Sequence, residues 1–364
     1  MHLLHVVGAR PNFMKAAPLL RALDAKSVQQ TLVHSGQHYD RNMSDIFFDQ
    51  LGMRAPDVNL QVGGGSHAQQ TAGIISRFEP VLLEKKPDGV IVYGDVNSTA
   101  AVAMVCSKLG FKLIHVEAGL RSYDRTMPEE INRLITDQLA DVLLTPSIDG
   151  NENLQREGIP ASRIHLVGNI MIDTLVRILP VADERFSHLA AQHDLKKFGL
   201  VTMHRPSNVD DITHLRPIVE ALDHIAEHVP LVFPVHPRTR QRLDEHGLKI
   251  NRLKLIEPLP YVDFLAFQKH AALVITDSGG VQEETTYLGV PCLTVRENTE
   301  RPVTVTIGTN QLVGFDLELL EGEALKILAG KGKGGAVPPF WDGHTAERIA
   351  EVLTTDSHVM TASV

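Results

Sequence analysis

Short apolar runs alternate with segments of helical pattern along the whole chain of 364 residues. The apolar runs are rich in Val, Ile and Leu, and each is followed by Gly, Pro or polar residues. Near-continuous apolar runs are typical of strands that are buried on both faces of a parallel sheet. We therefore predict strands at 3–8, 30–36, 89–95, 112–119, 140–147, 199–204, 230–236, 254–259, 272–278 and 290–295.

Helical segments lie between these strands. The pattern predicts helices at 14–25 and 128–140, and a final helix at 344–353 that follows a Gly-rich loop at 330–337. The helix at 128–140 begins with Pro128 and two glutamates, which suit a helix start because negative charge favours the exposed backbone N–H groups there. Strand–helix alternation through the whole chain predicts an α/β protein of two Rossmann-like, doubly wound domains.

The boundary between the two domains is expected near 165–175, where a strand ends at Gly168 and a helix follows. A polar, less patterned stretch at 184–198 precedes the next predicted strand. Hydrophobic residues make up 43% of the chain, which is enough apolar material for two cores.

Charge and composition exclude several classes of function. The net charge of −9 disfavours a general affinity for nucleic acid or for anionic membranes, so an anionic ligand needs a local basic site. The chain has neither a run of about 18 apolar residues nor a signal-peptide pattern at its start, so we expect a cytoplasmic protein with no membrane partner. Cys106 and Cys292 lie in apolar surroundings and are expected to be buried free thiols. No CxxC, HxH or HExxH spacing occurs, so no metal site is predicted.

Reactive and charged residues follow the predicted strands. In open parallel sheets, ligands bind at the carboxyl ends of the strands, where helix N-termini also point. The residues expected at these ends are Gly8-Ala9-Arg10-Pro11, Gly94-Asp95, Glu117-Ala118-Gly119, His204-Arg205, His236-Pro237-Arg238 and Asp277-Ser278-Gly279-Gly280. So many acids, histidines and arginines at strand ends are hard to explain by packing, and they indicate an active site.

Two strand-to-helix turns are candidates for binding a diphosphate. GARPNFMK (8–15) is not a GxGxxG fingerprint, but it places Arg10 where a guanidinium can bind two phosphate oxygens. The alternative is that Arg10 only caps the turn. Lys15 either adds positive charge there or lies on a solvated helix face. TDSGGVQEE (276–284) has Ser278, Gly279 and Gly280 before a helix, where glycines allow a phosphate to approach backbone N–H groups.

Acids and histidines form the other candidates. Asp95, Glu117 and Glu129 are three carboxylates expected near one cleft, and crowded carboxylates perturb one another's pKa values, as acid–base chemistry requires. Glu130 and Arg133 are expected on the helix surface or in a salt bridge. The candidates for contact with phosphate or sugar oxygens are His204, in MHRPSN, and His236, in VHPRTR. The alternative for each is a structural histidine in a turn. The carboxylates that follow the glycine turn, of which one can accept both hydroxyls of a ribose, are Glu283 and Glu284.

Taken together, these segments resemble the non-hydrolysing UDP-N-acetylglucosamine 2-epimerases. The resemblance runs through almost the entire chain, and the order and spacing of its segments make it specific. The matching segments are GARPNFMKAAPL, GQHYD, YGDVNST, HVEAGLRS, PEEINR, VGNIMIDTL, MHRPSN, VHPRTR, TDSGGVQEE, LGVPCLTVRENTERP and GTNQLVG.

The resemblance implies a fold and a reaction. It implies a glycosyltransferase GT-B-like fold, with two Rossmann-like domains facing a cleft and a last helix that crosses back to the first domain. We thus expect an N-terminal domain at 1–168 plus 351–364, and a UDP-binding domain at 169–350. The family eliminates UDP to give a 2-acetamidoglucal and adds it back with the opposite configuration at C2, for precursors of surface polysaccharides. The resemblance further implies a UDP-sugar substrate, no redox cofactor and a homodimer.

The resemblance also implies roles for individual residues. Asp95, Glu117, Glu129 and His204 match the family's catalytic groups. The matches to diphosphate contacts are Arg10, His204, Ser278, Gly279 and Gly280, and Arg301 follows a loop that closes near the phosphates. Glu284 matches the acid that binds ribose, and Phe264 matches an aromatic beside the uracil, although its place in PYVDFLAF alone favours the core. A second UDP-sugar activates many bacterial members, and Gln37 and His38 match part of that site, but 61–70 lacks the expected arginine.

Several alternatives stay open from the sequence. Many bacterial members have TRPE where this chain has Ala9-Arg10-Pro11-Asn12, and HGDTTT where it has YGDVNS at 93–98. These variants, with SYDRTMPEE, resemble relatives that epimerise UDP-diacetamido-glucuronic acid. A glycosyltransferase or a hydrolysing epimerase of the same fold is a further alternative, although PEEINR and ENTERP favour the non-hydrolysing type. A nucleotide-sugar-binding regulator without turnover would need fewer acids.

Overall fold

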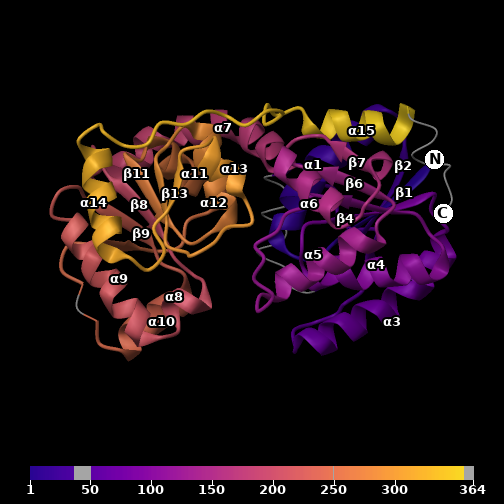
Figure 1. The fold of residues 1–364 in the computed structure, drawn as a ribbon, viewed down its shortest axis with the longest axis horizontal. Helices are drawn as coiled ribbons and strands as arrows, with labels where there is room; N and C mark the ends of the chain where they lie inside the picture. Colours follow the sequence, from indigo (N-terminus) through magenta and orange to yellow (C-terminus); the bar gives the residue numbers. More distant parts are fainter. Residues whose placement is uncertain (37–50, 249, 356–364) are drawn as a thin grey trace. The chain divides into compact units, whose positions relative to one another are not determined.

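The computed structural model describes residues 1–36, 51–248 and 250–355, in two compact units (Figure 1). Unit 1 comprises Met1–Thr174 and Pro339–Val364, and unit 2 comprises Leu175–Pro338. The chain passes from unit 1 to unit 2 within the helix α7 (Ile170–Gln192), so the stretch expected to be poorly patterned continues this helix to Gln192. The first domain is expected from the sequence to end at 168 and to resume at 351, whereas unit 1 ends at 174 and resumes at 339.

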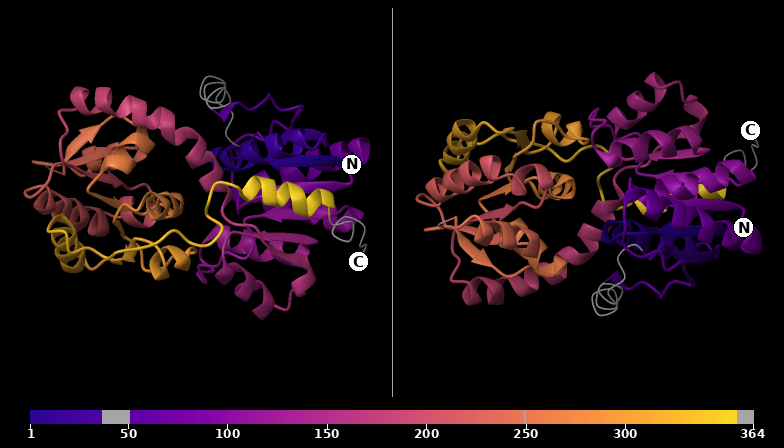
Figure 2. Two further views of the ribbon diagram at one scale, coloured as in Figure 1. Left: turned by 90° about the horizontal axis from the view of Figure 1, so that it is seen from above. Right: turned by 90° about the horizontal axis from the view of Figure 1, so that it is seen from below.

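Unit 1 is built on one sheet of parallel strands in the order β3-β2-β1-β4-β5-β6-β7. The strands are β1 (His2–Val7), β2 (Gln29–His34), β3 (Val58–Asn59), β4 (Gly89–Tyr93), β5 (Leu113–Val116), β6 (Val142–Thr145) and β7 (Ile164–Leu166). The helices are α1 (Arg10–Ala25), α3 (His67–Lys85), α4 (Asn97–Leu109), α5 (Pro128–Leu139), α6 (Ile148–Arg156), the 3₁₀ turn η1 (Ala161–Arg163) and α15 (Thr345–Thr355). Helices cover both faces of this sheet (Figure 2).

Unit 2 repeats the plan with the order β10-β9-β8-β11-β12-β13, again all parallel. Its strands are β8 (Gly199–Thr202), β9 (Leu231–Pro234), β10 (Lys254–Ile256), β11 (Leu273–Thr276), β12 (Cys292–Thr294) and β13 (Asn310–Leu312). Its helices, besides most of α7, are α8 (Pro206–Val209), α9 (Ile212–Ile225), α10 (Pro237–Glu245), α11 (Tyr261–His270), α12 (Gly279–Leu288), α13 (Pro302–Thr306) and α14 (Leu317–Leu328). The strands predicted from the sequence include every strand of both sheets except the short β3 and β13.

Both sheets have the strand order of the Rossmann fold, which confirms the predicted fold class. Numbered within each unit, the strands run 3-2-1-4-5-6, with β7 added at the edge of unit 1. The order reverses between β1 and β4 in unit 1, and between β8 and β11 in unit 2. In such sheets the crevice for a ligand opens beside this reversal, at the carboxyl ends of the two strands. Each unit thus has one position where a site is expected.

The central strands are buried on both faces, as their apolar sequences predict. Every residue of β4, β5 and β11 is buried. The core of unit 1 includes Phe78 and Val92, and that of unit 2 includes Phe233 and Ile275. Both cysteines are buried free thiols, as expected.

The last helix belongs to unit 1. α15 packs on α1 (Figure 1), and Asp173, in α7, accepts hydrogen bonds from the backbone N–H groups of Thr345 (3.1 Å) and Ala346 (2.7 Å). The indole N–H of buried Trp341 donates to the carbonyl of Pro146 at 2.9 Å. These contacts attach the C-terminal segment to unit 1 from Pro339 onward.

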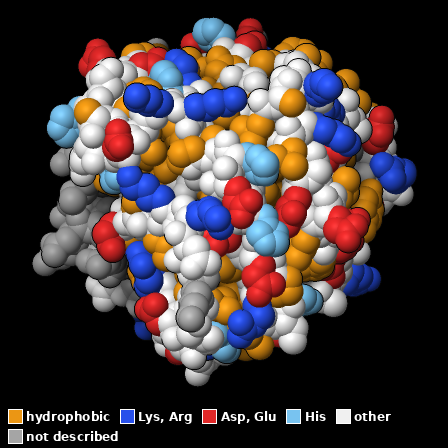
Figure 3. Space-filling model, turned by 90° about the vertical axis from the view of Figure 1, so that its left-hand side faces the viewer, with side chains coloured by type: hydrophobic (Ala, Val, Ile, Leu, Met, Phe, Trp, Pro, Cys, Tyr) orange, Lys and Arg blue, Asp and Glu red, His pale blue; other side chains and the backbone are white. Residues whose placement is uncertain are grey.

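The surface carries mixed charge over the face that Figure 3 shows, where Lys and Arg side chains are interspersed with Asp and Glu. That face therefore presents no field of a single sign. Across the described residues, every helix is too short or too polar to span a membrane. The cytoplasmic location and the lack of a nucleic-acid partner remain predictions from the sequence.

We predict that Asp173→Ala loosens α15. Loss of a side chain that caps a helix N-terminus costs about 1 to 2 kcal/mol, so backbone amides of α15 should exchange roughly 5 to 30 times faster. Hydrogen exchange followed by mass spectrometry measures this directly. Asp316→Ala is the matched control, because Asp316 caps α14 in unit 2 through Leu319 N–H. Equal exchange of α15 in both variants would contradict the role of Asp173.

Candidate active site

The site in unit 1 begins at the turn between β1 and α1. The side-chain oxygen of Asn12 accepts the backbone N–H groups of Gly8 (3.0 Å) and Ala9 (3.1 Å), and its amide donates to the carbonyl of Tyr93 at 2.9 Å. Asn12 is buried, so it joins the end of β1 to the end of β4 across the strand-order reversal. Arg10 begins α1 directly after this turn.

Lys15 and Glu117 form a buried ion pair. Lys15 Nζ lies 2.5 Å from Glu117 Oε2, and both side chains are more than nine-tenths buried. Gly94 has φ +60°, and a Cβ there would lie 2.8 Å from Lys15 Nζ, so the ammonium packs directly against the glycine turn. Lys15 therefore does not lie on a solvated helix face; it compensates the charge of the candidate acid Glu117, whose own backbone has φ +73°.

Asp95 follows Gly94 and is held from α5. Arg133 Nε donates to Asp95 Oδ2 at 3.0 Å, and the amide of Asn132 donates to the Asp95 carbonyl at 2.8 Å. A quarter of the Asp95 side chain remains exposed, whereas Arg133 is buried. The structure thus brings Asp95 and Glu117 to neighbouring strand ends, each beside a buried cation.

The two glutamates at the start of α5 have different surroundings. Glu129 is exposed and lies one turn before Arg133 on the same helix face. Glu130 is buried, pairs with Arg133, and accepts the backbone N–H groups of Ser122 (3.0 Å) and Tyr123 (2.9 Å). The salt-bridge prediction for Glu130 and Arg133 is confirmed, but the helix-surface alternative is wrong because Glu130 organises the preceding loop.

In unit 2, Asp277 orients His204. Asp277, at the end of β11, is fully buried and accepts backbone N–H groups of His204 (3.0 Å) and Arg205 (2.9 Å). Its Oδ1 also lies 3.2 Å from His204 Nδ1, which leaves Nε2 of this half-exposed histidine for a ligand. Burial works to raise the pKa of Asp277, but the hydrogen bond and charge of His204 outweigh it and lower the pKa.

His236 caps a helix. Its Nδ1 accepts the backbone N–H of Arg238 at 3.3 Å at the start of α10. Desolvation, followed by the charges of His204 and Arg238, lowers the pKa of His236. The ring is therefore neutral near pH 7 and bound to its own turn through Nδ1, so a ligand contact would use Nε2.

Three arginines and two glutamates form a group of ion pairs beside the N-terminus of α12. We call this group the arginine cluster; its members are Arg205, Arg296, Arg301, Glu283 and Glu300. One carboxylate, Glu300, is buried and lies 2.6 Å from Arg301, 2.8 Å from Arg296 and 3.7 Å from Arg205. Arg301 also pairs with Glu283 at 2.8 Å. Three guanidinium groups thus face two carboxylates beside the start of the helix, where the exposed backbone N–H groups favour an anion.

The candidate glycines at this turn differ. A Cβ on Gly279 would lie 2.5 Å from Arg301 NH1, so glycine allows the arginine to approach the helix start. A Cβ on Gly280 would meet no atom within 4 Å among the described residues, so packing there does not require glycine. Ser278 precedes them as the N-cap residue, with a backbone N–H that donates to Thr276 Oγ1. The space beside Gly280 is thus open among the described residues, whereas the Arg301 side chain fills the space beside Gly279.

Glu284 is buried one turn further along α12. The hydroxyl of Tyr261 donates to Glu284 Oε1 at 2.8 Å. Burial raises the pKa of Glu284 to about 7, the charge of Glu283 adds to this, and the hydrogen bond from Tyr261 opposes it. Phe264 lies one turn after Tyr261 on α11 and is half-buried, so the core position that its local sequence favours is wrong.

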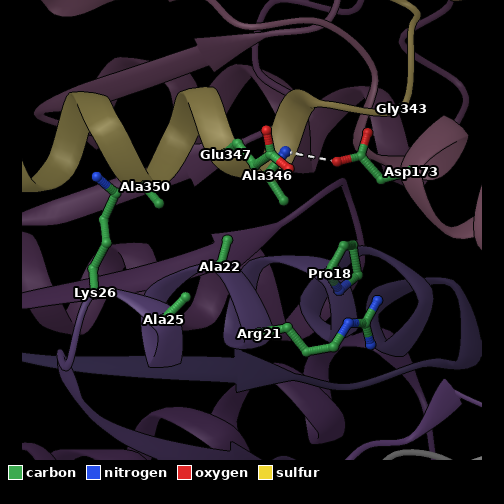
Figure 4. A pocket seen from close by; sticks show the side chains of 10 residues that line it. All are labelled: Pro18, Arg21, Ala22, Ala25, Lys26, Asp173, Gly343, Ala346, Glu347 and Ala350. Carbon is green, nitrogen blue, oxygen red and sulfur yellow. Dashed lines mark hydrogen bonds between the residues drawn. The ribbon is translucent and has the colours of Figure 1, made fainter.

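Some candidates cannot be placed in this site. Gln37 and His38 lie outside the described residues, and for Arg10 only the backbone is described. A hollow of about 490 Å³ lies between α1 and α15 (Figure 4), but none of the predicted site residues lines it; Ala22, Ala25, Ala346 and Ala350 are among its walls. Within the described residues, no group of three or more His, Cys, Asp or Glu side chains is arranged to hold a metal ion.

The residues that hold the candidates in place are not predictable from the sequence. The sequence predicts Asp277 only as a strand-end residue, and it predicts no role for Asn12 or Tyr261. Their signal in the sequence is weak, because a buried aspartate, asparagine or tyrosine is recognised only by what it contacts. The structure gives each of them a partner at a strand end or at the start of α12.

Comparisons with known proteins agree over almost the full chain. A family model described as UDP-N-acetylglucosamine 2-epimerase matches residues 21–354. The UDP-N-acetylglucosamine 2-epimerase of Methanocaldococcus jannaschii is 43% identical to this chain, and the match covers 97% of this chain and 99% of that protein. The UDP-2,3-diacetamido-2,3-dideoxy-D-glucuronate 2-epimerase of Pseudomonas aeruginosa is 42% identical, also over 97% of this chain and 99% of its own. The crystal structure of the Methanocaldococcus jannaschii enzyme with UDP-GlcNAc and UDP superposes with a TM-score of 0.89 at 42% identity, covering 97% of this chain and 99% of that one.

We predict that ionisation of Glu284 destabilises unit 2. Because its folded-state pKa of about 7 lies above the ordinary value of 4.5, the stability it contributes is complete below pH 4.5 and is lost as the pH rises through 7. Glu284→Gln should abolish a loss of up to about 3 kcal/mol between pH 5 and 8, measured by urea unfolding. Glu220→Gln, at an exposed position of α9 in the same unit, should leave the loss intact. An unaltered pH dependence in Glu284→Gln would refute the assignment.

Proposed function

The chain belongs to the UDP-N-acetylglucosamine 2-epimerase family, and on this premise we propose that it inverts C2 of UDP-N-acetylglucosamine to give UDP-N-acetylmannosamine. The observation that supports this most is the pairing of Asp95 and Glu117 with buried cations at neighbouring strand ends, since the reaction must remove and replace a proton. The family membership makes the chain an enzyme; its substrate and product are the proposal.

The reaction proceeds by elimination and re-addition. The C2 proton of the sugar is not adjacent to a carbonyl, so its removal alone is too costly. A base takes the proton as the bond from C1 to the diphosphate oxygen breaks, and the electron pair of that bond leaves with UDP. C1 and C2 are then joined by a double bond in a 2-acetamidoglucal. Protonation of C2 from the opposite face and re-addition of UDP at C1 complete the inversion.

Unit 1 supplies the groups for proton transfer. Asp95, Glu117 and Glu129 are the candidate acids and bases, and Lys15 and Arg133 hold two of them from buried positions. A buried carboxylate with a fixed cation needs little reorganisation as charge develops on the substrate. Arg10 at the start of α1 is the candidate in unit 1 for the diphosphate.

Unit 2 supplies the groups that bind UDP and stabilise it as a leaving group. His204, oriented by Asp277, and the turn at 278–280 bind the diphosphate, together with Arg301 of the arginine cluster. The helix N-terminus and the guanidinium groups beside it favour the charge that UDP gains when it leaves. Glu284 binds the ribose and Phe264 the uracil. His236 contributes a donor through Nε2.

One of the comparisons supports a second candidate substrate. The Pseudomonas aeruginosa relative, which is named for a diacetamido-glucuronate, is nearly as similar to this chain as the Methanocaldococcus jannaschii epimerase. The same elimination applies to that sugar. A homodimer, and activation by a second UDP-sugar, remain predictions from the resemblance.

The experiment that tests the reaction is incubation with UDP-N-acetylglucosamine in D₂O, followed by NMR. We expect the C2 epimer to appear with deuterium at C2, because the base exchanges its proton with solvent between the two steps. A trace of the opposite epimer is added in parallel as an activator. Free sugar with UDP would indicate a hydrolysing enzyme, and no change would reject this substrate. UDP-2,3-diacetamido-glucuronic acid is assayed alongside to decide between the two sugars.

We predict that Glu117→Gln lowers kcat by about 100- to 10,000-fold, the range for loss of a general acid or base. The amide keeps the size of the side chain but neither transfers a proton nor balances Lys15. Glu84→Gln is the matched control, because Glu84 forms an exposed ion pair with Lys85 at 2.9 Å on α3. Activity within twofold of the starting protein in Glu117→Gln would remove Glu117 from the chemistry.

A further inference from the structure

A buried polar network lies directly beneath the strand ends of unit 1. Its members are His115 in β5, Asp137 in α5, and Arg121 in the loop between them, with Glu157 at the end of α6. The side chains of His115 and Asp137 are completely inaccessible to solvent, and that of Arg121 is almost so. Neither the proposed reaction nor the binding of UDP uses these residues.

Both ring nitrogens of His115 face oxygen acceptors. Nδ1 lies 2.6 Å from the carboxylate of Asp137, and Nε2 lies 2.8 Å from the backbone carbonyl of Gly94. A carboxylate and a carbonyl only accept hydrogen bonds, so both ring nitrogens donate and the ring carries two protons. His5, another buried histidine of this sheet, differs: burial lowers its pKa to about 3, so it is neutral.

Asp137 connects the ring to the other strand end. Its second oxygen accepts the backbone N–H of Gly119 at 3.1 Å and Arg121 NH1 at 2.6 Å. Burial alone would raise the pKa of Asp137, but the charges and hydrogen bonds of His115 and Arg121 lower it. Arg121 in turn is held by Glu157 through two hydrogen bonds of 2.8 and 2.6 Å. The aspartate is therefore a carboxylate with fixed partners on every side.

The two backbone groups held by this network flank the candidate acids. Gly94 immediately precedes Asp95, and Gly119 lies two residues after Glu117. The register pairs Tyr93 with Val116, so the turns that carry the acids leave the sheet side by side. Both turns use left-handed backbone, with φ +60° at Gly94 and +73° at Glu117. Glycine adopts such a φ freely, but at Glu117 the conformation persists only where surrounding contacts determine it.

A buried ionic network is a poor source of stability. Replacing buried ion pairs by apolar side chains of similar volume is often neutral or stabilising, because desolvation costs as much as the attraction gains. An apolar residue would also fit β5, whose neighbours Ile114 and Val116 are apolar and buried. The network does provide two directional hydrogen bonds to the turns, which no apolar side chain can make.

We propose that His115 is a positioning residue, and that it fixes the Asp95 and Glu117 turns relative to each other through the Gly94 carbonyl and Asp137. This inference rests on the proposed function, since the acids it positions are those of the epimerisation. A displacement of about 1 Å in a catalytic group can cost on the order of 100-fold in rate. His115 acts on the reaction only through the backbone and never touches the sugar.

Two substitutions separate positioning from stability. In His115→Gln the amide nitrogen occupies the place of Nε2 and still donates to the Gly94 carbonyl; in His115→Asn it occupies the place of Nδ1 and reaches only Asp137. Both variants remove the same charge from the same cavity. We expect His115→Asn to lower kcat about 10- to 100-fold with KM changed less than threefold, and His115→Gln to regain most of the lost kcat. His5→Asn is the control for a buried histidine that bonds Tyr93 (2.7 Å), and it should lower the melting temperature without lowering kcat.

Equal loss of kcat in both His115 variants, or a comparable loss of kcat in His5→Asn, overturns the proposal. A measurement on the unaltered protein keeps it testable if His115→Asn does not fold. NMR of protein labelled with ¹⁵N-histidine should show two ring N–H protons of His115 that exchange slowly with solvent, and absence of the Nε2 proton overturns the proposal. Because this signal needs no substrate, it is independent of the epimerase assay, whose failure on the unaltered protein would reject the proposed function alone.

Discussion

The burial of parallel strands on both faces is the constraint on which the structure depends. A strand such as β4, with every residue buried, has no room for charge along its length. The candidate acids and bases therefore stand at strand ends, and the strand order brings those ends together at one reversal in each unit. The same burial that forms the core thus concentrates the chemistry.

Burial also sets the conditions under which these charges persist. An isolated charge at a buried strand end would cost several kcal/mol, and the candidates Glu117, Asp95 and His204 each have a partner there. Lys15 pairs with Glu117, Arg133 with Asp95, and Asp277 with His204. Each partner also fixes the direction of the group it contacts, so one contact both lowers the cost of burial and orients a candidate group.

The two units share one strand order but carry different groups at the point where it reverses. In unit 1 the reversal carries acids with single buried cations, an arrangement suited to proton transfer. In unit 2 it carries a helix N-terminus beside the arginine cluster, which suits a diphosphate. Glu284 is buried one turn further along α12, and this burial raises its pKa to about 7.

The sequence by itself determined the class of fold, most strands, and which residues stand at strand ends, because apolar periodicity and chain order report local structure and burial directly. It also indicated the family, through segments such as PEEINR whose order is specific. The tertiary structure alone decided that Lys15 pairs with Glu117, that Glu130 is buried while Glu129 is exposed, and that His115 bonds both Asp137 and Gly94. These contacts join residues 21 to 102 positions apart, and no local pattern encodes which distant partner will meet a side chain inside a packed core.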